Sequence, residues 1–379
     1  MFISRNILTE VKRRLAEDYA KIIVIYGARQ VGKTTLVEKL LEEFQDKQIL
    51  SIDGDSFKYR NILSSSDPDK LAELVAGKDL IFIDEAQRIE NIGINLKIMY
   101  DKFRNLKIIV TGSSAFDLAN KVKEPLTGRT YTYRLYPISF LELQNQQNSF
   151  ELKEQLEQRL IYGSYPNLLS IKNNNDKKEY LNNLVADYLY RDVLEFQNIK
   201  HSNKLKDLLL LLAFQIGSEV SFHELGKKLN MSRLTVESYI NLLEQAFVVF
   251  TLRGFSRNLR KEVNKKPKIY FYDLGIRNAL INNFAHLDLR EDTGKLWENF
   301  LVVERLKRNE YKRYFCNKYF WRTYTGAELD YIEEYDGNLY GYEFKWQKTA
   351  KAPQAWLENY SKEFATINKD NFLDFVLST

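Results

Sequence analysis

Cysteine is nearly absent from this chain of 379 residues, which contains one, Cys316. A single cysteine excludes an internal disulfide, and three scattered histidines form no zinc-binding pattern. No apolar run reaches the roughly 18 residues that are needed to span a bilayer. The N-terminal segment has no apolar signal core. We therefore expect a cytoplasmic protein with no membrane partner.

A strong excess of one charge is also missing, because the net charge is +5 and the isoelectric point is about 8.8. The basic residues are nevertheless clustered in the C-terminal half. Residues 305–322 carry seven basic side chains against one acid, and residues 253–270 show the same ratio. The latter cluster comprises Arg253, Arg257, Arg260, Lys261, Lys265, Lys266 and Lys268. Such clusters suit contacts with nucleic acid phosphates.

The length is too great for one ordinary core, so we expect several domains. Four short β-branched runs, at residues 21–26, 48–53, 79–84 and 106–112, alternate with helical stretches. This alternation predicts a parallel sheet that is covered on both faces. We expect an α/β P-loop NTPase domain at 1–150, a helical lid or linker at 151–203, a winged-helix-like domain at 204–270, and an α+β nuclease-like domain at 271–379.

A phosphate-binding loop follows the first of these strands. The stretch "GARQVGKT", residues 27–34, fills the pattern G-x-x-x-x-G-K-[ST] between a strand and a helix. Its backbone N–H groups can face phosphates, Lys33 can reach the β- and γ-phosphates, and Thr34 can ligate Mg²⁺. We expect ATP and Mg²⁺ as cofactors, and no guanine-reading "NKxD" is present. The expected binding residues are Gly27, Ala28, Arg29, Gln30, Val31, Gly32, Lys33, Thr34 and Thr35.

The stretch "LIFIDEAQ" supplies the carboxylates that hydrolysis requires. Asp84 ends a buried strand, where it can bind Mg²⁺ directly or through water, and Glu85 is the candidate general base. The next strand ends in "VTGSSA", where Ser113 could orient the attacking water. Cap chemistry for the following helix is an equally good interpretation of Ser113 and of its neighbours Thr111 and Ser114.

The segments "GARQVGKTTL", "LIFIDEAQ", "IIVTGSSA" and "LTGRTYTYRLYPISFLE" occur in this order. Together they resemble the AAA-type ATPases of bacteria and archaea whose C-terminal half was long a domain of unknown function. The resemblance implies that Arg129 is a phosphate-sensing or finger arginine; alternatively, it is a surface arginine on a strand. The resemblance also implies a restriction-endonuclease-like fold in the C-terminal domain.

Residues 221–255 read as helix, tight turn, helix and β-ribbon, which is a winged-helix pattern. We expect Ser232 to cap the second helix. The side chains expected in the core are Phe222, Leu225, Leu229, Leu234, Val236, Ile240 and Leu243. Those expected to face a major groove are Arg233, Thr235, Ser238 and Tyr239. Winged helices also bind proteins, so this pattern alone leaves the partner open.

The last segment contains Asp330, a "DG" turn, and then Glu343 and Lys345. On adjacent strands Asp330 and Glu343 could share Mg²⁺, Lys345 could polarise a water or a phosphate, and Glu298 could complete the acidic set. This order resembles the restriction-endonuclease core. The E-x-K pattern itself is weak, because it also occurs at Glu10, Glu151 and Glu310.

Two functions fit these patterns. One is a DNA-associated ATPase whose basic winged-helix and C-terminal region cuts or grips DNA. The other is a nucleotide-controlled, homo-oligomeric signalling switch whose C-terminal half is a protein-binding scaffold. A metabolic kinase is disfavoured, because "DEAQ" in the sheet centre and the winged helix have no place in a small phosphotransferase.

Overall fold

A computed structural model describes residues 3–18, 21–113, 126–186, 202–257 and 266–378. The chain divides into two compact units. The first runs through Pro137 and includes Gln245–Phe247, and the second comprises Ile138–Glu244 and the chain from Val248 onward. None of the helices in the described ranges combines the length and apolarity that crossing a bilayer requires.

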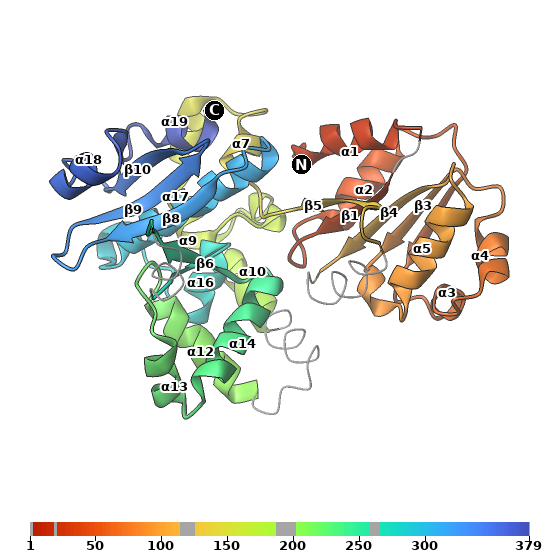
Figure 1. Cartoon of the computed structure of the whole chain (residues 1–379), viewed down its shortest axis with the longest axis horizontal. Helices are drawn as coiled ribbons and strands as arrows, with labels where there is room; N and C mark the ends of the chain where they lie inside the picture. The colour runs from red at the N-terminus through yellow and green to blue at the C-terminus, as the bar shows by residue number, and fades with distance from the viewer. Residues whose placement is uncertain (1–2, 19–20, 114–125, 187–201, 258–265, 379) are drawn as a thin grey trace. The chain divides into compact units, whose positions relative to one another are not determined.

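The first unit is built on a parallel sheet with the strand order β2-β3-β4-β1-β5 (Figure 1). Its strands are β1 (Ile22–Tyr26), β2 (Ile49–Asp53), β3 (Leu80–Asp84), β4 (Lys107–Gly112) and β5 (Thr130–Arg134). The four strands predicted from apolar runs are confirmed, together with the parallel α/β class. The fifth strand, β5, pairs with β1 in the register Ile22↔Thr130 and was not predicted.

Helices cover this sheet. They are α1 (Ile7–Leu15), α2 (Lys33–Leu41), α3 (Phe57–Leu63), α4 (Pro68–Val75) and α5 (Ile92–Lys102), with the short 3₁₀ turn η1 (Ala86–Arg88). Helix α1 packs on α2, while α4 packs on both α3 and α5. Every residue of β1 is buried, as expected for a strand covered on both faces.

The second unit contains a six-stranded sheet in the order β11-β10-β9-β8-β6-β7. Its strands are β6 (Val249–Gly254), β7 (Lys268–Phe271), β8 (Asn317–Arg322), β9 (Glu328–Tyr335), β10 (Asn338–Phe344) and β11 (Phe364–Ile367). Strand β6 pairs with β7 antiparallel and with β8 parallel. The β9–β10 turn is at Asp336 and Gly337, as predicted, with φ of 48° and 79°. The ranges 204–270 and 271–379 therefore contribute strands to one sheet.

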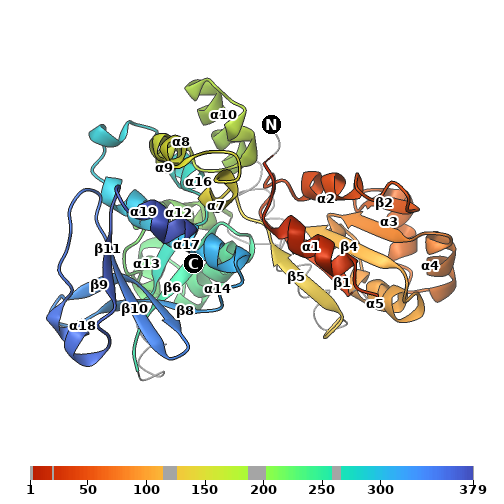
Figure 2. The same cartoon turned by 90° about the horizontal axis from the view of Figure 1, so that it is seen from above.

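Helices surround this second sheet (Figure 2). They are α7 (Phe140–Leu143), α8 (Ser149–Glu154), α9 (Leu156–Tyr162), α10 (Asn174–Leu184), α12 (Ser202–Phe214), α13 (Phe222–Leu229), α14 (Arg233–Gln245), α16 (Leu274–Leu280), α17 (Thr293–Tyr311), α18 (Gln354–Asn359) and α19 (Phe372–Leu377), with the 3₁₀ turns η2 (Pro166–Leu169) and η4 (Leu287–Leu289). Helix α9 packs closely on α16. At this contact Asp273 accepts a hydrogen bond of 2.7 Å from Ser164 N.

The two helices predicted around the "NMS" turn form as α13 and α14. The Oγ of Ser232 accepts a hydrogen bond of 3.0 Å from Thr235 N, which confirms the predicted cap. Buried core positions include Leu225, Val236, Ile240 and Leu243, whereas Phe222 and Leu229 are half-buried. The expectation for Leu234 was wrong, because its side chain is 75% exposed. Two residues before Val236, it lies on the other side of the helix.

Much of the basic cluster at residues 305–322 serves the interior of the second unit. Arg305, Lys307 and Arg308 are buried on α17, against which α19 packs (Figure 2). Arg305 donates to Phe375 O at 2.6 Å, Arg308 to Ser378 O at 2.7 Å and Lys312 to Leu377 O at 2.7 Å. These carbonyls lie at the C-terminal end of α19, where cations are favoured. The expectation of a nucleic acid surface does not hold for the three buried side chains.

Candidate functional site

The phosphate-binding loop connects β1 to α2, and its geometry depends on two glycines. Gly32 has a φ of 92°, which places it in the left-handed region directly before the first residue of α2. A Cβ at Gly27 would lie 2.2 Å from the carbonyl oxygen of Leu135. Both positions therefore require glycine. The loop delivers backbone N–H groups of the α2 N-terminus to one point, which is a ready anion site.

Lys33, the first residue of α2, is buried and folds back over the loop. Its Nζ donates to the carbonyl oxygens of Gly27 and Ala28, both at 3.0 Å, and lies 3.8 Å from Glu85 Oε1. Burial lowers the pKa of Lys33, while the charges of Glu85 and Asp84 oppose that effect. A phosphate bound at the loop would meet a cation that is already oriented toward it.

Asp84 and Thr34, the two predicted magnesium ligands, are in contact. Thr34 Oγ1 donates a hydrogen bond of 2.6 Å to Asp84 Oδ2. Thr111, at the end of the neighbouring strand β4, donates to Asp84 Oδ1. A carboxylate and a hydroxyl that share one point fit Mg²⁺, which prefers oxygen ligands. Thr34 and Asp84 would hold the ion next to the phosphates.

Glu85 follows Asp84 in a left-handed conformation with a φ of 45°, an unusual backbone for a non-glycine residue. Burial acts to raise the pKa of Glu85, but Lys33, then Gln87 and Ser113, outweigh it, so the pKa falls below its usual value. Glu85 is therefore ionised and able to accept a proton. Gly54 permits this turn, because a Cβ there would lie 2.6 Å from Glu85 O.

Gln87 connects the two predicted catalytic residues of this site. Its Nε2 donates to Glu85 and, at 2.9 Å, to Ser113 Oγ. The structure thus brings Ser113 beside Glu85, while Ser114 lies outside the described residues. Sequence reasoning did not assign Gln87 a role. The available signal was its place two residues after Glu85, at the end of a buried strand.

Arg5 is a second residue that sequence reasoning missed. Its guanidinium is 4% exposed, and it donates to Val31 O at 2.8 Å and to Tyr136 O at 2.5 Å. It therefore ties the phosphate-binding loop to the segment that follows β5. No motif in the sequence identifies this contact.

Arg129 is not near the residues of the phosphate-binding loop. Ile22 N donates to Arg129 O at 2.9 Å, so Arg129 lies beside the N-terminal end of β1. The loop follows Tyr26, at the C-terminal end of this strand. Parallel strands rise about 3.3 Å per residue, so about 13 Å of strand separates these two ends. The side chain of Arg129 instead bonds Asp101, with Nε 3.0 Å from Oδ1.

A carboxylate cluster, Glu298, Asp330 and Glu343, lies in the second unit. These side chains come from α17, β9 and β10 and are all buried. Lys268 Nζ lies 2.8 Å from Glu298 Oε1 and 3.5 Å from Asp330 Oδ1. Burial and the charge of Glu298 raise the pKa of Asp330 to about 7, against the opposing effect of Lys268.

The cluster contains the predicted residues and one that was assigned elsewhere. Lys345 Nζ lies 2.6 Å from Glu343 Oε1. Lys268 was expected among surface phosphate contacts, and this was wrong, because its side chain is 8% exposed and faces the carboxylates. Across the described ranges, no group of three or more His, Cys, Asp or Glu side chains is arranged to hold a metal ion.

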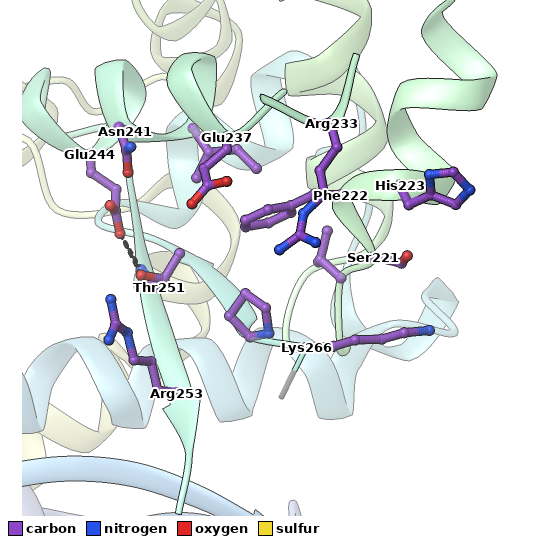
Figure 3. Close-up of a pocket in the computed structure, with 13 residues that line it drawn as sticks. Ser221, Phe222, His223, Arg233, Glu237, Asn241, Glu244, Thr251, Arg253 and Lys266 are labelled. Atoms are coloured by element: carbon purple, nitrogen blue, oxygen red, sulfur yellow. Dashed lines mark hydrogen bonds between the residues drawn. The ribbon is translucent and has the colours of Figure 1, made fainter. Parts of the chain in front are cut away.

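A groove beside α14 forms a third feature, of about 290 Å³. We call it the α14 groove, and its lining includes Phe222, Arg233, Glu237, Asn241, Glu244, Thr251, Arg253 and Lys266. Figure 3 shows Arg233 and Glu237 of α14 and Arg253 of β6 extending toward the same space. Of the four residues expected at a DNA groove, Arg233 lines it, whereas Thr235 contacts Ser232. Arg260, Lys261 and Lys265 lie outside the described residues.

The parallel sheet and the phosphate-binding loop define the first unit as a P-loop nucleotide-binding domain. Residues 19–144 match the AAA domain family. Residues 153–287 match a domain of unknown function, DUF8612, and residues 293–369 match another, DUF4143.

Two relatives are similar over very different shares of the chain. An uncharacterised Mycobacterium tuberculosis protein is 28% identical over 335 residues, covering 88% of this chain and 72% of the relative. An uncharacterised ATP-binding protein of Methanocaldococcus jannaschii is 41% identical over 49 residues, covering 13% of this chain and 83% of the relative.

Among solved structures, a Thermotoga maritima RuvB variant covers 70% of this chain and 96% of its own, at 16% identity and a TM-score of 0.35. Aquifex aeolicus DnaA bound to AMPPCP covers 64% of this chain and 90% of its own, at 16% identity and a TM-score of 0.34. At these scores, the assignment rests on the AAA domain match and on the geometry of the loop.

Proposed function

We propose that the first unit hydrolyses ATP. The observation that carries this proposal is the contact between Thr34 and Asp84, 2.6 Å apart, with the ionised Glu85 directly next to them. Lys33 and the loop N–H groups bind the phosphates. A magnesium ion, when bound at Thr34 and Asp84, supplies charge neutralisation on the β- and γ-phosphates.

In this mechanism Glu85 accepts a proton from the attacking water. The water oxygen forms a bond to the γ-phosphorus, while the bond between the γ-phosphorus and the bridging oxygen of ADP breaks. Gln87 holds the Glu85 carboxylate, and Ser113 holds Gln87. The experiment is a phosphate-release assay with ATP and GTP, together with nucleotide binding. Lys33→Ala should lose both nucleotide binding and hydrolysis. Glu85→Gln should keep nucleotide binding and lose hydrolysis, and hydrolysis at the wild-type rate in Glu85→Gln would refute the proposal.

Arg129 enters the proposal as a finger toward a neighbouring copy of the chain. It lies at the opposite end of the strands from the loop of its own chain, so a contact with the γ-phosphate bound there is disfavoured. If Arg129 of one chain completes the nucleotide site of a neighbouring chain, the site is complete only in a homo-oligomer. Nucleotide-dependent assembly is therefore part of the proposed function.

The α14 groove supports DNA as the partner of the second unit. Arg233, Glu237 and Asn241 follow one another at four-residue spacing, so they form one stripe along α14. Arginine, glutamate and asparagine are the side chains that read guanine, cytosine and adenine edges. Arg253 and Lys266 line the same groove and suit phosphate contacts. Glu244, the other acidic residue of the groove, accepts hydrogen bonds from Thr251 N at 2.6 Å and from Thr251 Oγ1 at 2.7 Å.

Fluorescence anisotropy with duplex DNA over a salt series tests this partner. Arg233→Ala and Arg253→Ala should weaken binding, and Arg253→Ala should reduce the salt slope by about one. Lys348→Ala removes the same charge at an exposed residue outside the groove and should bind as the wild type does. No DNA binding at low salt would favour the protein-binding switch instead, whereas a nucleotide-dependent change of mass is expected for both functions.

Mg²⁺-dependent cleavage by the carboxylate cluster is the competing function for this region, and it holds only if Lys268 leaves Glu298 and Asp330 free to bind the ion. It is favoured by the placement of Asp330 and Glu343 on the antiparallel strands β9 and β10, where the next pair along is Tyr331↔Tyr342. A plasmid cleavage assay with Mg²⁺ or Mn²⁺ tests it. If Asp330→Ala leaves an observed cleavage unchanged, Asp330 is not part of the nuclease site.

A further inference from the structure

The carboxylate cluster contains its own cation. Lys268 is the first residue of β7, and its ammonium lies between Glu298 and Asp330, 2.8 Å from Glu298 Oε1 and 3.5 Å from Asp330 Oδ1. Tyr270, on the same strand, donates to Glu298 Oε1 at 2.7 Å. A buried carboxylate needs a paired charge, and here the chain itself provides one.

Most carboxylate oxygens of the cluster already have a hydrogen-bond or ion-pair partner, so few are free to bind a metal ion. Glu298 uses Oε1 for Lys268 and Oε2 for Lys295, the latter at 3.4 Å. Asp330 uses Oδ1 for Lys268 and Oδ2 for the backbone N–H of Phe344, at 2.9 Å. Glu343 uses Oε1 for Lys345, whereas its buried Oε2 has no hydrogen-bond partner in the described chain.

A metal ion placed at this centre would therefore find one free carboxylate oxygen, Glu343 Oε2. Divalent cations such as Mg²⁺ need several oxygen ligands at short range. The arrangement does not fit the ion that the nuclease-like interpretation requires. We propose that Lys268 is a resident cation that takes the place of a metal ion, so that the wild-type cluster binds no divalent cation.

This assignment has a constructive consequence. Replacing Lys268 by methionine releases Glu298 Oε1 and Asp330 Oδ1, which then join Glu343 Oε2 as three oxygens without a cation. The three buried carboxylates would then keep only the half-exposed Lys295 and Lys345 as counter-charges, which is unfavourable. A divalent cation would neutralise them, so the substitution should create a metal site in place of the ammonium.

The test is Mn²⁺ titration of the full chain by calorimetry, without nucleotide, together with thermal unfolding with and without Mn²⁺. Lys268→Met should gain Mn²⁺ binding and a rise in melting temperature on adding Mn²⁺. The double variant Lys268→Met/Asp330→Asn should lose that gain. Lys295→Met is the matched control, because Lys295 also contacts Glu298 but is 46% exposed, and it should behave as the wild type does.

Two outcomes would overturn the proposal. One is Mn²⁺ binding by the wild type that Asp330→Asn abolishes. The other is a folded Lys268→Met chain that gains no binding. A Lys268→Met chain that folds only when Mn²⁺ is present supports the proposal. ATP hydrolysis, measured on the same samples, reports on the first unit and is independent of these results.

Discussion

Gln87 Nε2 lies 2.9 Å from Ser113 Oγ while it also donates to Glu85, so one amide fixes the relation between the end of β3 and the end of β4. Gln87 is therefore placed to position Glu85, the proposed general base. We expect Gln87→Ala to lower kcat for ATP about tenfold, as for other residues that hold a catalytic ligand, with little change in KM.

The pH profile distinguishes positioning from simple support of the fold. The hydrogen bond from Gln87 lowers the pKa of Glu85. Its removal raises that pKa, so less Glu85 is ionised at a given pH, and the acidic limb of the kcat profile should move to higher pH. An acidic limb that stays in place, with a lowered kcat, would assign Gln87 a structural role alone.

Arg129 gives a prediction about assembly. We expect Arg129→Ala to lower ATP hydrolysis about a thousandfold or more, as the loss of an arginine finger does. Mixing Arg129→Ala with Lys33→Ala should restore activity, because one chain then offers an intact loop and the other an intact arginine. For a randomly mixed dimer, about a quarter of the wild-type rate is expected.

The matched control for this experiment is Arg104→Ala. Arg104 is exposed and precedes β4, so it lies at the same end of the strands as Arg129. It should hydrolyse ATP normally. If the two inactive variants assemble together and stay inactive, Arg129 does not act across an interface.

Gly163 ends α9 and packs against Asp273 in the second unit. It has a φ of 77°, and a Cβ there would lie 2.0 Å from Asp273 Oδ1. Asp273 cannot turn away without losing its bonds to Ser164 N and Ile276 N. We expect Gly163→Ala to lower the free energy of unfolding by about 3 kcal/mol or more in urea denaturation.

Gly337→Ala separates the backbone strain from the clash. Gly337 has a φ of 79°, and no atom lies within 4 Å of a Cβ built there. Its substitution should cost about 1 to 2 kcal/mol, the price of a left-handed alanine. Equal losses in the two variants would show that Asp273 can move.

Asp292 predicts a pH-dependent contribution to stability. It pairs with Arg277 at 2.5 Å and with Arg290 at 2.8 Å. Burial opposes its ionisation, but Arg290 and Arg277 outweigh burial and lower the pKa from 3.8 to about 2. The pairing therefore contributes about 2 kcal/mol to the free energy of unfolding above pH 4, and this is lost as the pH falls toward 2.

Urea denaturation of the wild type and of Asp292→Asn at pH 7, 5 and 3 measures this contribution. The difference between them should be constant from pH 7 to 5 and should have fallen by about 1 kcal/mol at pH 3. Other carboxylates titrate equally in both chains and cancel. A difference that does not change between pH 5 and 3 would contradict the shifted pKa.

Local patterns predicted the loop and the strands that make up the candidate nucleotide site. The loop, the strand ending at Asp84 and the hydroxyls after β4 are each determined by a short stretch of chain, and parallel strands bring their ends together. The strand β5 was not predicted, because "TYTYR" has few apolar side chains and gains its place by pairing with β1.

Other features depend on contacts between distant segments. Lys268 reads as one more member of a basic run, and its inward direction depends on Glu298 and Asp330. Arg5 contacts Val31 and Tyr136, which are distant in sequence. Leu234 was expected in the core because it is apolar, but helical geometry turned it outward. Charge and hydrophobicity set what a residue can do, and the fold selects which partner it finds.

Strand β6 has a neighbour on each edge, β7 on one side and β8 on the other. A chimera that takes α12, α13, α14 and the β6–β7 pair from a relative would pair β8 with a strand from another sequence. It would also remove Lys268 from three carboxylates that stay behind. Exchange of this module between relatives therefore requires that α17, β8, β9 and β10 travel with it.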